Sequence, residues 1–550
     1  MDVLRSCLLW WPLGSRAPQY ETLSHLEGVA RISEEQELVI LQDGHRITMT
    51  LLETGIRVER CGTFAWNSAA HIEVVPFLHV LFAEISSGPA NHSLFEFSYL
   101  SAVTSKFQLR KVSGDVTSIH GTTLLKWVAD VQAKAYKDLT PRRRFLVCIN
   151  PHGGQGKAKQ LWRETIAPIM NAAGCDVHVQ YTGPVSSPTN AAEIARNLNL
   201  TAYDALVPIS GDGIVNELLN GLASRPDALT ALRMPIAPIP AGSGNALSVN
   251  LMGPDKVLDV AYATLNAIKG QPLPLDVCSV TQGQTRIYSF LSQALGLMAD
   301  LDMGTEWIRW VGGIRFILGF LWGAITRRRY DVEITLKIVE SGKQRMADDY
   351  NKHQHQNILS PAAERNLLAS DLNVGMPPLA FGTTESPLPL GVVHNRLEAN
   401  LEPGWHTFRV PMQFILGGKL PWASRESMTL PLAKNDGLID VVIVRPRSAL
   451  ATIKSLDRQE EGKYVAASDC YYYKVEAYRC TPLERSGYIS IDGESIPYKS
   501  FQVENHARLA RIMSVETRWK GLERVIHVAA TCILIEPFFN LETCAFAIRP

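Results

Sequence analysis

Three glycine-containing turns carry the residues whose types and spacing suggest chemistry. They are residues 150–157 (NPHGGQGK), 210–213 (SGDG) and 240–246 (PAGSGNA). Glycine adopts positive φ and lets the backbone approach a phosphate closely, so the amides of such turns can bind phosphate groups. The side chains of Ser243 and Asn245 could add hydrogen bonds. A single turn of this kind is ordinarily structural, but three in this order predict a nucleotide site.

Spacing excludes two common nucleotide-binding motifs. Residues 153–158 superficially suggest a Walker loop, yet the Gly-x4-Gly-Lys-Ser/Thr spacing is absent and Ala158 lacks the hydroxyl that such a loop gives to Mg²⁺. Neither the turn at 211–213 nor the turn at 242–244 has the third glycine of a dinucleotide fingerprint. A Walker-type NTPase and a Rossmann dehydrogenase are therefore both excluded.

The elements that must position these turns alternate between strand and helix. Apolar runs at 145–149, 205–209 and 236–239 each precede a turn, and helical sequence follows at 158–173, 214–223 and 245–251. This alternation predicts an α/β fold with a parallel sheet covered by helices. Ligands of such sheets bind beyond the carboxyl ends of the strands, where the turns lie. We place this nucleotide-binding α/β domain at residues 141–275.

The regions on either side are predicted to be rich in β-structure. Residues 1–140 contain short β-prone runs at 37–41, 71–75 and 94–100, which indicate an N-terminal β-rich domain. Alternating strands at 330–339, 438–444 and 488–491 predict an antiparallel β-sandwich over 276–520. Residues 340–402, rich in Pro, Asn, Gln and Ser, are expected to be a mostly disordered insertion. In the tail, 521–550, the apolar run 528–535 could be a docked strand or a membrane-touching element.

Composition limits the partners and the compartment. Lys+Arg and Asp+Glu both number 54, so there is no net attraction to nucleic acid. Nine cysteines without metal-ligand spacing favour a reducing cytoplasm over a secreted disulfide framework. No signal peptide is expected, because Pro12 interrupts the first apolar run. The lipophilic stretch 307–325 contains Arg309 and Arg315, so no transmembrane helix is expected either.

The three turns together resemble the diacylglycerol kinase catalytic superfamily. The matching residues are 150–157, 210–213 with Glu217 and the pair at 220–221, and 240–246. Within that superfamily, the segment from Ser292 to Asp302, followed by Glu306, Arg309 and Arg315, resembles the sphingosine kinases, and so does the turn at 492–494. The resemblance covers roughly residues 141–515. The region before it is only loosely similar to fungal and plant long-chain base kinases.

The resemblance implies an ATP-dependent transfer of phosphate to the primary hydroxyl of a sphingoid base. Asp212 would be the general base, Asp492 would help to hold Mg²⁺, and Asp302 with Ser292 nearby would bind the substrate's polar end. The ATP site would be lined by Asn150, Gly153, Gly154, Gly156, Ser210, Gly211, Gly213, Glu217, Gly242, Ser243, Gly244, Asn245, Arg309, Arg315 and Glu494. Contact with membranes would be peripheral and reversible, because the substrate resides there. One departure from the family is Gln155, where many relatives have a basic residue.

Some of these residues could instead have a purely structural role. Asp212 could serve only as a helix N-cap, and Arg309 and Arg315 could be snorkelling residues of a buried helix. Asp300 could pair locally. The function also has rivals: a diacylglycerol or ceramide kinase of the same superfamily, or a catalytically silent scaffold that binds nucleotide or lipid. The sequence leaves the oligomeric state and the preferred base undetermined.

Overall fold

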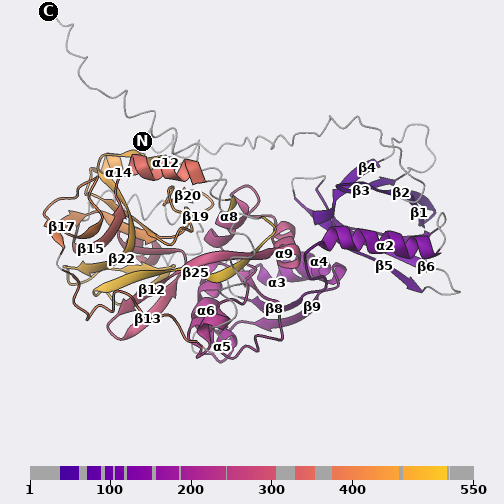
Figure 1. The fold of residues 1–550 in the computed structure, drawn as a ribbon, viewed down its shortest axis with the longest axis horizontal. Helices are drawn as coiled ribbons and strands as arrows, with labels where there is room; N and C mark the ends of the chain where they lie inside the picture. Colours follow the sequence, from indigo (N-terminus) through magenta and orange to yellow (C-terminus); the bar gives the residue numbers. More distant parts are fainter. Residues whose placement is uncertain are drawn as a thin grey trace, which may run out of the picture. The chain divides into compact units, whose positions relative to one another are not determined.

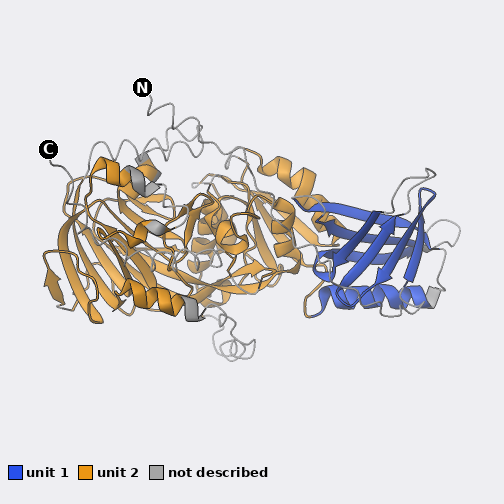
Figure 2. Ribbon diagram, turned by 90° about the horizontal axis from the view of Figure 1, so that it is seen from above, with its two compact units in different colours: residues 1–137 blue, residues 138–550 orange. Residues whose placement is uncertain are grey.

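Two compact units make up the chain, residues 1–137 and 138–550 (Figure 2). The computed structural model describes residues 37–60, 71–87, 93–102, 106–116, 121–151, 156–184, 187–242, 244–304, 329–353, 374–389, 391–456, 462–516 and 519–520. The expected domains at 141–275 and 276–520 both lie in the second unit. The apolar run at 528–535 lies outside the described residues.

In the described residues of the first unit, a seven-stranded antiparallel sheet packs against helix α2 (Gly121–Tyr136) (Figure 1). The strands run in the order β4-β3-β2-β1-β7-β6-β5. They are β1 (Glu37–Gln42), β2 (His45–Leu51), β3 (Gly55–Arg60), β4 (His71–Pro76), β5 (Val80–Ser87), β6 (Ser93–Ser101) and β7 (Gln108–Val116). On helix α2, Trp127 meets the Phe95 ring edge-on and the Tyr136 hydroxyl donates to the Leu81 carbonyl at 2.6 Å. The predicted β-rich N-terminal region is confirmed.

The second unit begins with a four-stranded parallel sheet in the order β11-β10-β8-β9. Its strands are β8 (Arg144–Ile149), β9 (Asp176–Tyr181), β10 (Ala205–Ser210) and β11 (Ile239–Pro240). Every residue of β10 is buried, as expected of an apolar parallel strand covered by helices. The three glycine turns directly follow β8, β10 and β11. The predicted α/β architecture is therefore confirmed.

Helices follow the turns where the sequence predicts them. After the first turn, α3 (Ala158–Leu161), a π turn (Trp162–Ile166) and α4 (Ala167–Ala172) form one continuous helical segment. Helix α6 (Asp212–Ala223) follows the second turn and α8 (Ala246–Met252) follows the third. Helices α5 (Ala191–Arg196), α7 (Ala228–Ala231) and α9 (Val260–Lys269) complete this part. The Asn190 side chain caps α5, and the Asp259 side chain caps α9.

A twelve-stranded, mainly antiparallel sheet forms the rest of the second unit (Figure 1). Its main path is β13-β12-β25-β22-β21-β18-β14-β23-β24, and β15, β17 and β16 branch from β22. The strands are β12 (Gln271–Gln282), β13 (Thr285–Ser289), β14 (Ser292–Gly296), β15 (Tyr330–Glu340), β16 (Val392–His394), β17 (Gly404–Met412), β18 (Phe414–Gly418), β21 (Ile439–Val444), β22 (Cys470–Pro482), β23 (Ile489–Ile491), β24 (Glu494–Ile496) and β25 (Phe501–Ser514). The strands enclose a common apolar core that includes Ile334, Phe408, Val441, Tyr473 and Val503.

Shorter elements cover this sheet. They are α10 (Leu297–Gly304), α12 (Lys343–His353), α14 (Ala449–Leu456) and a two-stranded ribbon of β19 (Trp422–Ser424) and β20 (Ser427–Met428). Residues 295–303 contain Leu297, Ala299 and Leu301, which are buried in a second apolar cluster with Met346 and Val442.

The parallel and antiparallel sheets meet at Ile236. This residue forms parallel bridges to Leu206 on one side and to Ile512 on the other. Its N–H donates to the Arg511 carbonyl at 3.0 Å, and its own carbonyl accepts from the Met513 N–H at 2.9 Å. The long strand β25 therefore connects the two sheets by main-chain hydrogen bonds.

A buried network of charges lies inside the antiparallel sheet. The Lys419 ammonium is 2.9 Å from Asp276, and their side chains are 1% and 0% exposed. Lys474 is 2.8 Å from Asp436 and 3.0 Å from Asp440. Asp276 also accepts hydrogen bonds from the backbone N–H groups of Gly437 and Arg508. The buried charges are therefore paired, as the cost of desolvation requires.

The segment 340–402 differs from the sequence expectation. Residues 343–353 form α12, and residues 392–394 form β16 beside β17. The Glu504 carboxylate accepts from the N–H groups of Ala380 and Phe381, and Gln502 donates to the carbonyls of Phe381 and Gly382. The expectation of disorder is wrong for residues 343–353, 380–382 and 392–394. The contacts that order residues 380–382 come from β25, far along the chain. Residues 354–373 and 390 lie outside the described residues.

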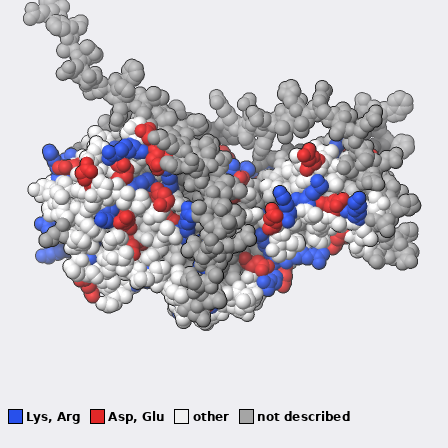
Figure 3. All heavy atoms as spheres, in the orientation of Figure 1, with Lys and Arg blue, Asp and Glu red and all other residues white. Residues whose placement is uncertain are grey.

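In the part of the chain that the structure describes, no helix is both long and apolar enough to cross a membrane. The stretch 307–325 is not in that part. On the face shown in Figure 3, basic and acidic side chains are interspersed on the described surface. This pattern agrees with the equal numbers of acidic and basic residues in the sequence.

Candidate active site

The second and third glycine turns touch each other at the carboxyl edge of the parallel sheet. Strands β10 and β11 pair through Ser210 and Pro240, which brings Gly211 next to Gly242. A Cβ atom added to Gly242 would lie 2.4 Å from the Gly211 Cα and 2.7 Å from the Gly211 nitrogen. Only glycine fits at position 242, so a backbone surface without side chains forms here. A Cβ atom added to Gly213 would lie 3.8 Å from a carboxylate oxygen of Glu494, so that side chain is close to the second turn.

Asn245 holds the third turn in shape. Its backbone is left-handed, with φ 53°, a conformation that asparagine tolerates better than most residues. Its side-chain oxygen accepts from the Gly242 N–H at 2.9 Å, and its side-chain amide donates to the Gly242 carbonyl at 2.7 Å. The sequence suggested that this side chain could bind phosphate. In the structure it binds the turn's own backbone and positions α8.

Gly242→Ala is expected to raise the KM for ATP and lower kcat/KM by about 10²-fold, because displacements near 1 Å at a reacting centre cost that much. The added methyl group would meet the Gly211 backbone, which cannot rotate away as a side chain could. Steady-state kinetics with varied ATP measures the effect, and thermal unfolding shows whether the fold survives. Gly375→Ala is the control, since its Cβ would make only ordinary contact at 3.7 Å. Unchanged ATP kinetics in Gly242→Ala would rule out a site at this turn.

Asp212 lies where the two turns meet. It is the first residue of α6, and its carboxylate accepts from the N–H groups of Ala246 at 2.7 Å and Leu247 at 2.9 Å. Both groups belong to the start of α8, so the carboxylate binds to the positive end of that helix. The surrounding protein desolvates Asp212 and raises its pKa, while the two N–H groups act in the opposite direction. The negative charge of Asp492 raises the pKa further.

Asp492 is a hydrogen-bond hub. Five donors reach its two oxygens: the Ser289 hydroxyl, the N–H groups of residues 290, 291 and 292, and the Asn216 side chain, at distances from 2.6 to 3.1 Å. Burial raises its pKa, and these donors counteract the rise. Its backbone N–H also donates to the Ser292 carbonyl at 2.8 Å. The residue expected to hold the metal thus also ties β13, β14 and α6 to the turn between β23 and β24.

Asn216 and Asn220 fix α6 in place, and sequence reasoning assigned no role to either. Asn220 accepts from the Tyr288 N–H at 2.8 Å and donates to the Tyr288 carbonyl at 2.9 Å. Asn216 donates to that carbonyl and to Asp492. Two amides four residues apart share one helix face, which is a signal the sequence does contain. Through them the helix that carries Asp212 is anchored to β13.

Other expected site residues lie near the same edge. The Glu217 carboxylate accepts from the Asn190 side chain at 2.8 Å and from the Ala191 N–H at 3.2 Å, and its pKa is raised by burial and by the charge of Glu494. The Ser210 hydroxyl donates to the Gly211 carbonyl at 2.8 Å. The Asn150 N–H donates to the Ile209 carbonyl at 3.3 Å. Gly156 has φ 70°, and a Cβ there would meet no atom within 4 Å.

Several expected site residues fall outside the described residues. These are Gly153, Gly154, Ser243, Arg309 and Arg315. Asp302 lies in α10, and its side chain is not described. Its neighbour Asp300 accepts a hydrogen bond from the Tyr330 hydroxyl of β15 at 2.5 Å, so its partner lies in a different element rather than nearby in the sequence.

The electrostatics of this edge suit a metal-bound polyphosphate. Asp212, Glu217 and Asp492 all have raised pKa values because burial disfavours their charged forms. A cation nearby would stabilise those charged forms, while the bare glycine backbone leaves room for phosphate. Among the described residues no three His, Cys, Asp or Glu groups are arranged to hold a metal ion by themselves.

Similarity to known proteins defines the class to which this chain belongs. The family model for the diacylglycerol kinase catalytic domain matches residues 144–280, which contain all three glycine turns and Asp212. The chain is a lipid kinase with this catalytic domain. A solved structure of a diacylglycerol kinase from Bacillus anthracis aligns over 68% of this chain and 97% of its own, with 18% identity and a TM-score of 0.44.

Relatives narrow the class further. Sphingoid long chain base kinase 4 of Schizosaccharomyces pombe is 31% identical over 453 residues, which are 81% of this chain and 89% of that protein. Sphingosine kinase 1 of Arabidopsis thaliana is 28% identical over 67% of this chain and 72% of its own. The chain belongs to the family of sphingoid long-chain base kinases. The resemblance expected from the turns and from residues 292–315 is thereby confirmed.

Proposed function

We propose that this kinase transfers the γ-phosphate of ATP to the primary hydroxyl of a sphingoid long-chain base, with Asp212 as the general base. The observation that carries the proposal is the position of the Asp212 carboxylate at the contact between two glycine turns, fixed there by α8. The substrate oxygen attacks the γ-phosphorus as the bond to the ADP oxygen breaks. The hydroxyl proton passes to Asp212, and a phosphate monoester and ADP leave.

Phosphoryl transfer depends mainly on positioning and on neutralising charge. In this proposal the turns at 150–156, 210–213 and 242–245 bind the phosphates through backbone N–H groups, and Arg309 and Arg315 neutralise the spreading negative charge. Bound Mg²⁺ would supply further positive charge at the phosphates. Asp492 is the carboxylate that we place toward the ion, and Glu494, close to Gly213, is proposed to line the ATP site. The Glu217 carboxylate links α6 to the start of α5.

The lipid is proposed to bind to the antiparallel part of the second unit, residues 276–520. A base with roughly fifteen methylenes has a transfer free energy of at most about 12 kcal/mol, so it stays in membranes and the enzyme needs an apolar site for it. We propose that the kinase is cytoplasmic and visits membranes reversibly. Ser292, at the start of β14 beside Asp492, lies close to the site and is proposed to contact the polar end of the substrate.

A lipid panel with radiolabelled ATP tests the substrate class. Sphinganine should be phosphorylated efficiently, whereas ceramide and diacylglycerol, which lack a free amine, should be poor substrates. Diacylglycerol phosphorylation at a rate equal to that of sphinganine would replace the proposal by a glycerolipid kinase. No transfer to any lipid, with retained nucleotide binding, would indicate a silent scaffold.

Asp302→Asn is expected to lower kcat/KM for sphinganine by about tenfold to a hundredfold. A carboxylate that pairs with the substrate ammonium contributes about 1.5 to 3 kcal/mol through a charge-assisted hydrogen bond. Ceramide, in which acylation removes the ammonium charge, should be no worse a substrate for the variant. Asp300→Asn on the same helix is the matched control, because Asp300 pairs with Tyr330. Equal losses on both lipids would show that Asp302 supports the fold.

A further inference from the structure

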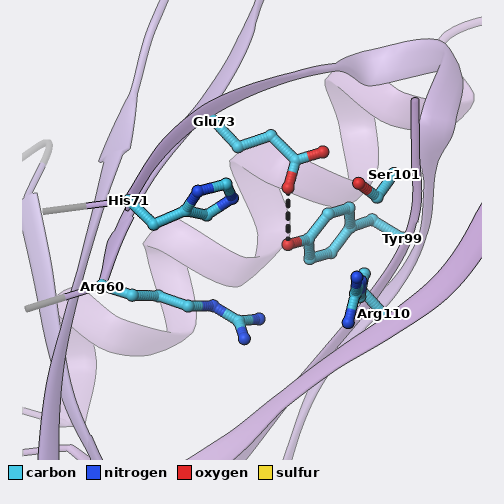
Figure 4. A pocket seen from close by; sticks show the side chains of 6 residues that line it. All are labelled: Arg60, His71, Glu73, Tyr99, Ser101 and Arg110. Atoms are coloured by element: carbon cyan, nitrogen blue, oxygen red, sulfur yellow. Dashed lines mark hydrogen bonds between the residues drawn. The ribbon is translucent and has the colours of Figure 1, made fainter. Parts of the chain in front are cut away.

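The first unit contains a polar cavity of about 240 Å³ (Figure 4). Its lining side chains are Arg60, His71, Glu73, Tyr99, Ser101 and Arg110. The residues of the candidate active site all lie in the second unit, so this cavity is a separate feature. None of its lining residues is assigned a role in the phosphoryl transfer proposed above.

Strand register brings the polar side chains together. Arg60 ends β3 and pairs across the strands with His71, which begins β4. Tyr99, near the end of β6, pairs with Arg110 of β7, and Ser101 ends β6. Residues directly opposite in an antiparallel pair have neighbouring side chains on one face. Two pairs of strands therefore present an arginine each to one cavity, and Figure 4 labels both.

Among the described residues that line the cavity, the one acidic group, Glu73, has a hydrogen-bond partner. The Tyr99 hydroxyl donates to the Glu73 carboxylate at 3.1 Å. Burial and the charge of Glu73 raise the pKa of Tyr99 to about 12, against the opposing effect of the nearby Arg60 guanidinium. The other polar groups that line the cavity are two guanidinium groups, an imidazole and the Ser101 hydroxyl. The arrangement favours an anionic ligand.

We propose that this cavity binds the phosphate-monoester headgroup of an anionic membrane lipid. Arginine is suited to phosphate because its planar fork donates two parallel hydrogen bonds to phosphate oxygens. A cavity of about 240 Å³ admits a phosphorylated headgroup and excludes a whole lipid. Ile72 and Val74 alternate along β4 with His71 and Glu73, so they project from the other face of this edge strand, where they are 50% and 53% exposed. Exposed apolar side chains on the strand that also lines the cavity favour a ligand carried by a bilayer over a free one.

Vesicle binding by the full-length protein tests the proposal. Phosphatidylcholine vesicles containing a phosphatidylinositol monophosphate are compared with vesicles that carry the same surface charge as phosphatidylserine. We expect at least about tenfold tighter binding to the phosphoinositide vesicles, and a loss of about tenfold or more in Arg60→Gln and in Arg110→Gln. Lys126→Gln removes a charge from the exposed face of α2 and should bind as the unmodified protein does. Ile72→Ser with Val74→Ser should weaken vesicle binding and leave binding of the soluble inositol bisphosphate headgroup unchanged.

Other outcomes would overturn the proposal. Equal binding to phosphatidylserine vesicles would mean that surface charge alone is recognised. Undiminished vesicle binding by Arg60→Gln and Arg110→Gln would show that the cavity does not bind the phosphoinositide. Binding of the soluble headgroup without vesicle binding would exclude a membrane ligand. Kinase activity on detergent-dispersed substrate should be unchanged in all variants, which separates failure here from failure of the proposed catalytic function.

Discussion

Asp212→Asn is expected to lower kcat by about 10²-fold or more, the usual loss when a general base is removed. An amide cannot accept the hydroxyl proton of the substrate. The same carboxylate also binds the N–H groups of Ala246 and Leu247, and asparagine retains only one oxygen for them. Some displacement of α8 would therefore accompany the loss of the base. Both kcat and the dissociation constant for ATP must be measured.

A second aspartate separates these two effects. Asp259 caps α9 by accepting from the Tyr262 N–H at 3.1 Å, away from the glycine turns. Asp259→Asn changes a helix-capping carboxylate in the same way and should leave kcat close to normal. If Asp212→Asn turns over substrate as fast as Asp259→Asn does, Asp212 is only a cap.

The pH dependence of kcat/KM in the unmodified enzyme should reflect the ionisation of Asp212. Burial raises the pKa of this group above the ordinary aspartate value of about 3.9. A general base works in its ionised form, so kcat/KM is retained above the raised pKa and falls as the pH drops through it. The acid limb of the pH–rate profile should therefore lie at higher pH than that of an ordinary aspartate. An acid limb at or below pH of about 4 would contradict this assignment.

The largest expected effect on stability follows from Lys419→Met. The Lys419 ammonium pairs with Asp276 where neither side chain reaches solvent. Its loss leaves the Asp276 charge buried without its cation, and breaking a buried pair in this way costs about 3 to 5 kcal/mol of unfolding free energy. Denaturant unfolding of the second unit measures the change.

Lys434→Met is the matched control. Lys434 is itself buried, but its partner Asp349 is 55% exposed, at 2.7 Å. Water can solvate that carboxylate when the lysine is removed, so the loss should be about 1 kcal/mol or less. Similar losses of unfolding free energy in the two variants would show that the buried charge network does not contribute more to stability than an exposed ion pair does.

The sequence predicted those parts of the site that depend on local pattern. Apolar runs that end in glycine turns defined β8, β10 and β11, because the carboxyl ends of parallel strands share one edge. Asp212 was identified from its turn, but its bonds to residues 246 and 247 were not, since these residues begin the helix that follows the next turn. Alternation also predicted the strands at 330–339 and 488–491.

Contacts between distant residues could not be predicted in this way. Asn216 and Asp492 are 276 positions apart, and no local pattern shows that they bond. The order of residues 380–382 depends on Gln502 and Glu504, which lie in β25. Composition rightly described that segment as polar, but polar segments become ordered when a strand elsewhere supplies hydrogen bonds.

Strand β25 makes the order of synthesis matter for this kinase. When residue 280 has left the ribosome, the whole stretch 144–280 that matches the catalytic domain is complete. Strand β12 nevertheless lacks its partner β25, and α6 lacks Asp492, so the nascent chain must wait for more than 200 further residues. At about 5 to 20 residues per second this delay lasts ten seconds or more. During that interval the apolar surface of β12 is uncovered, and a molecular chaperone that shields such surfaces would raise the yield of active enzyme.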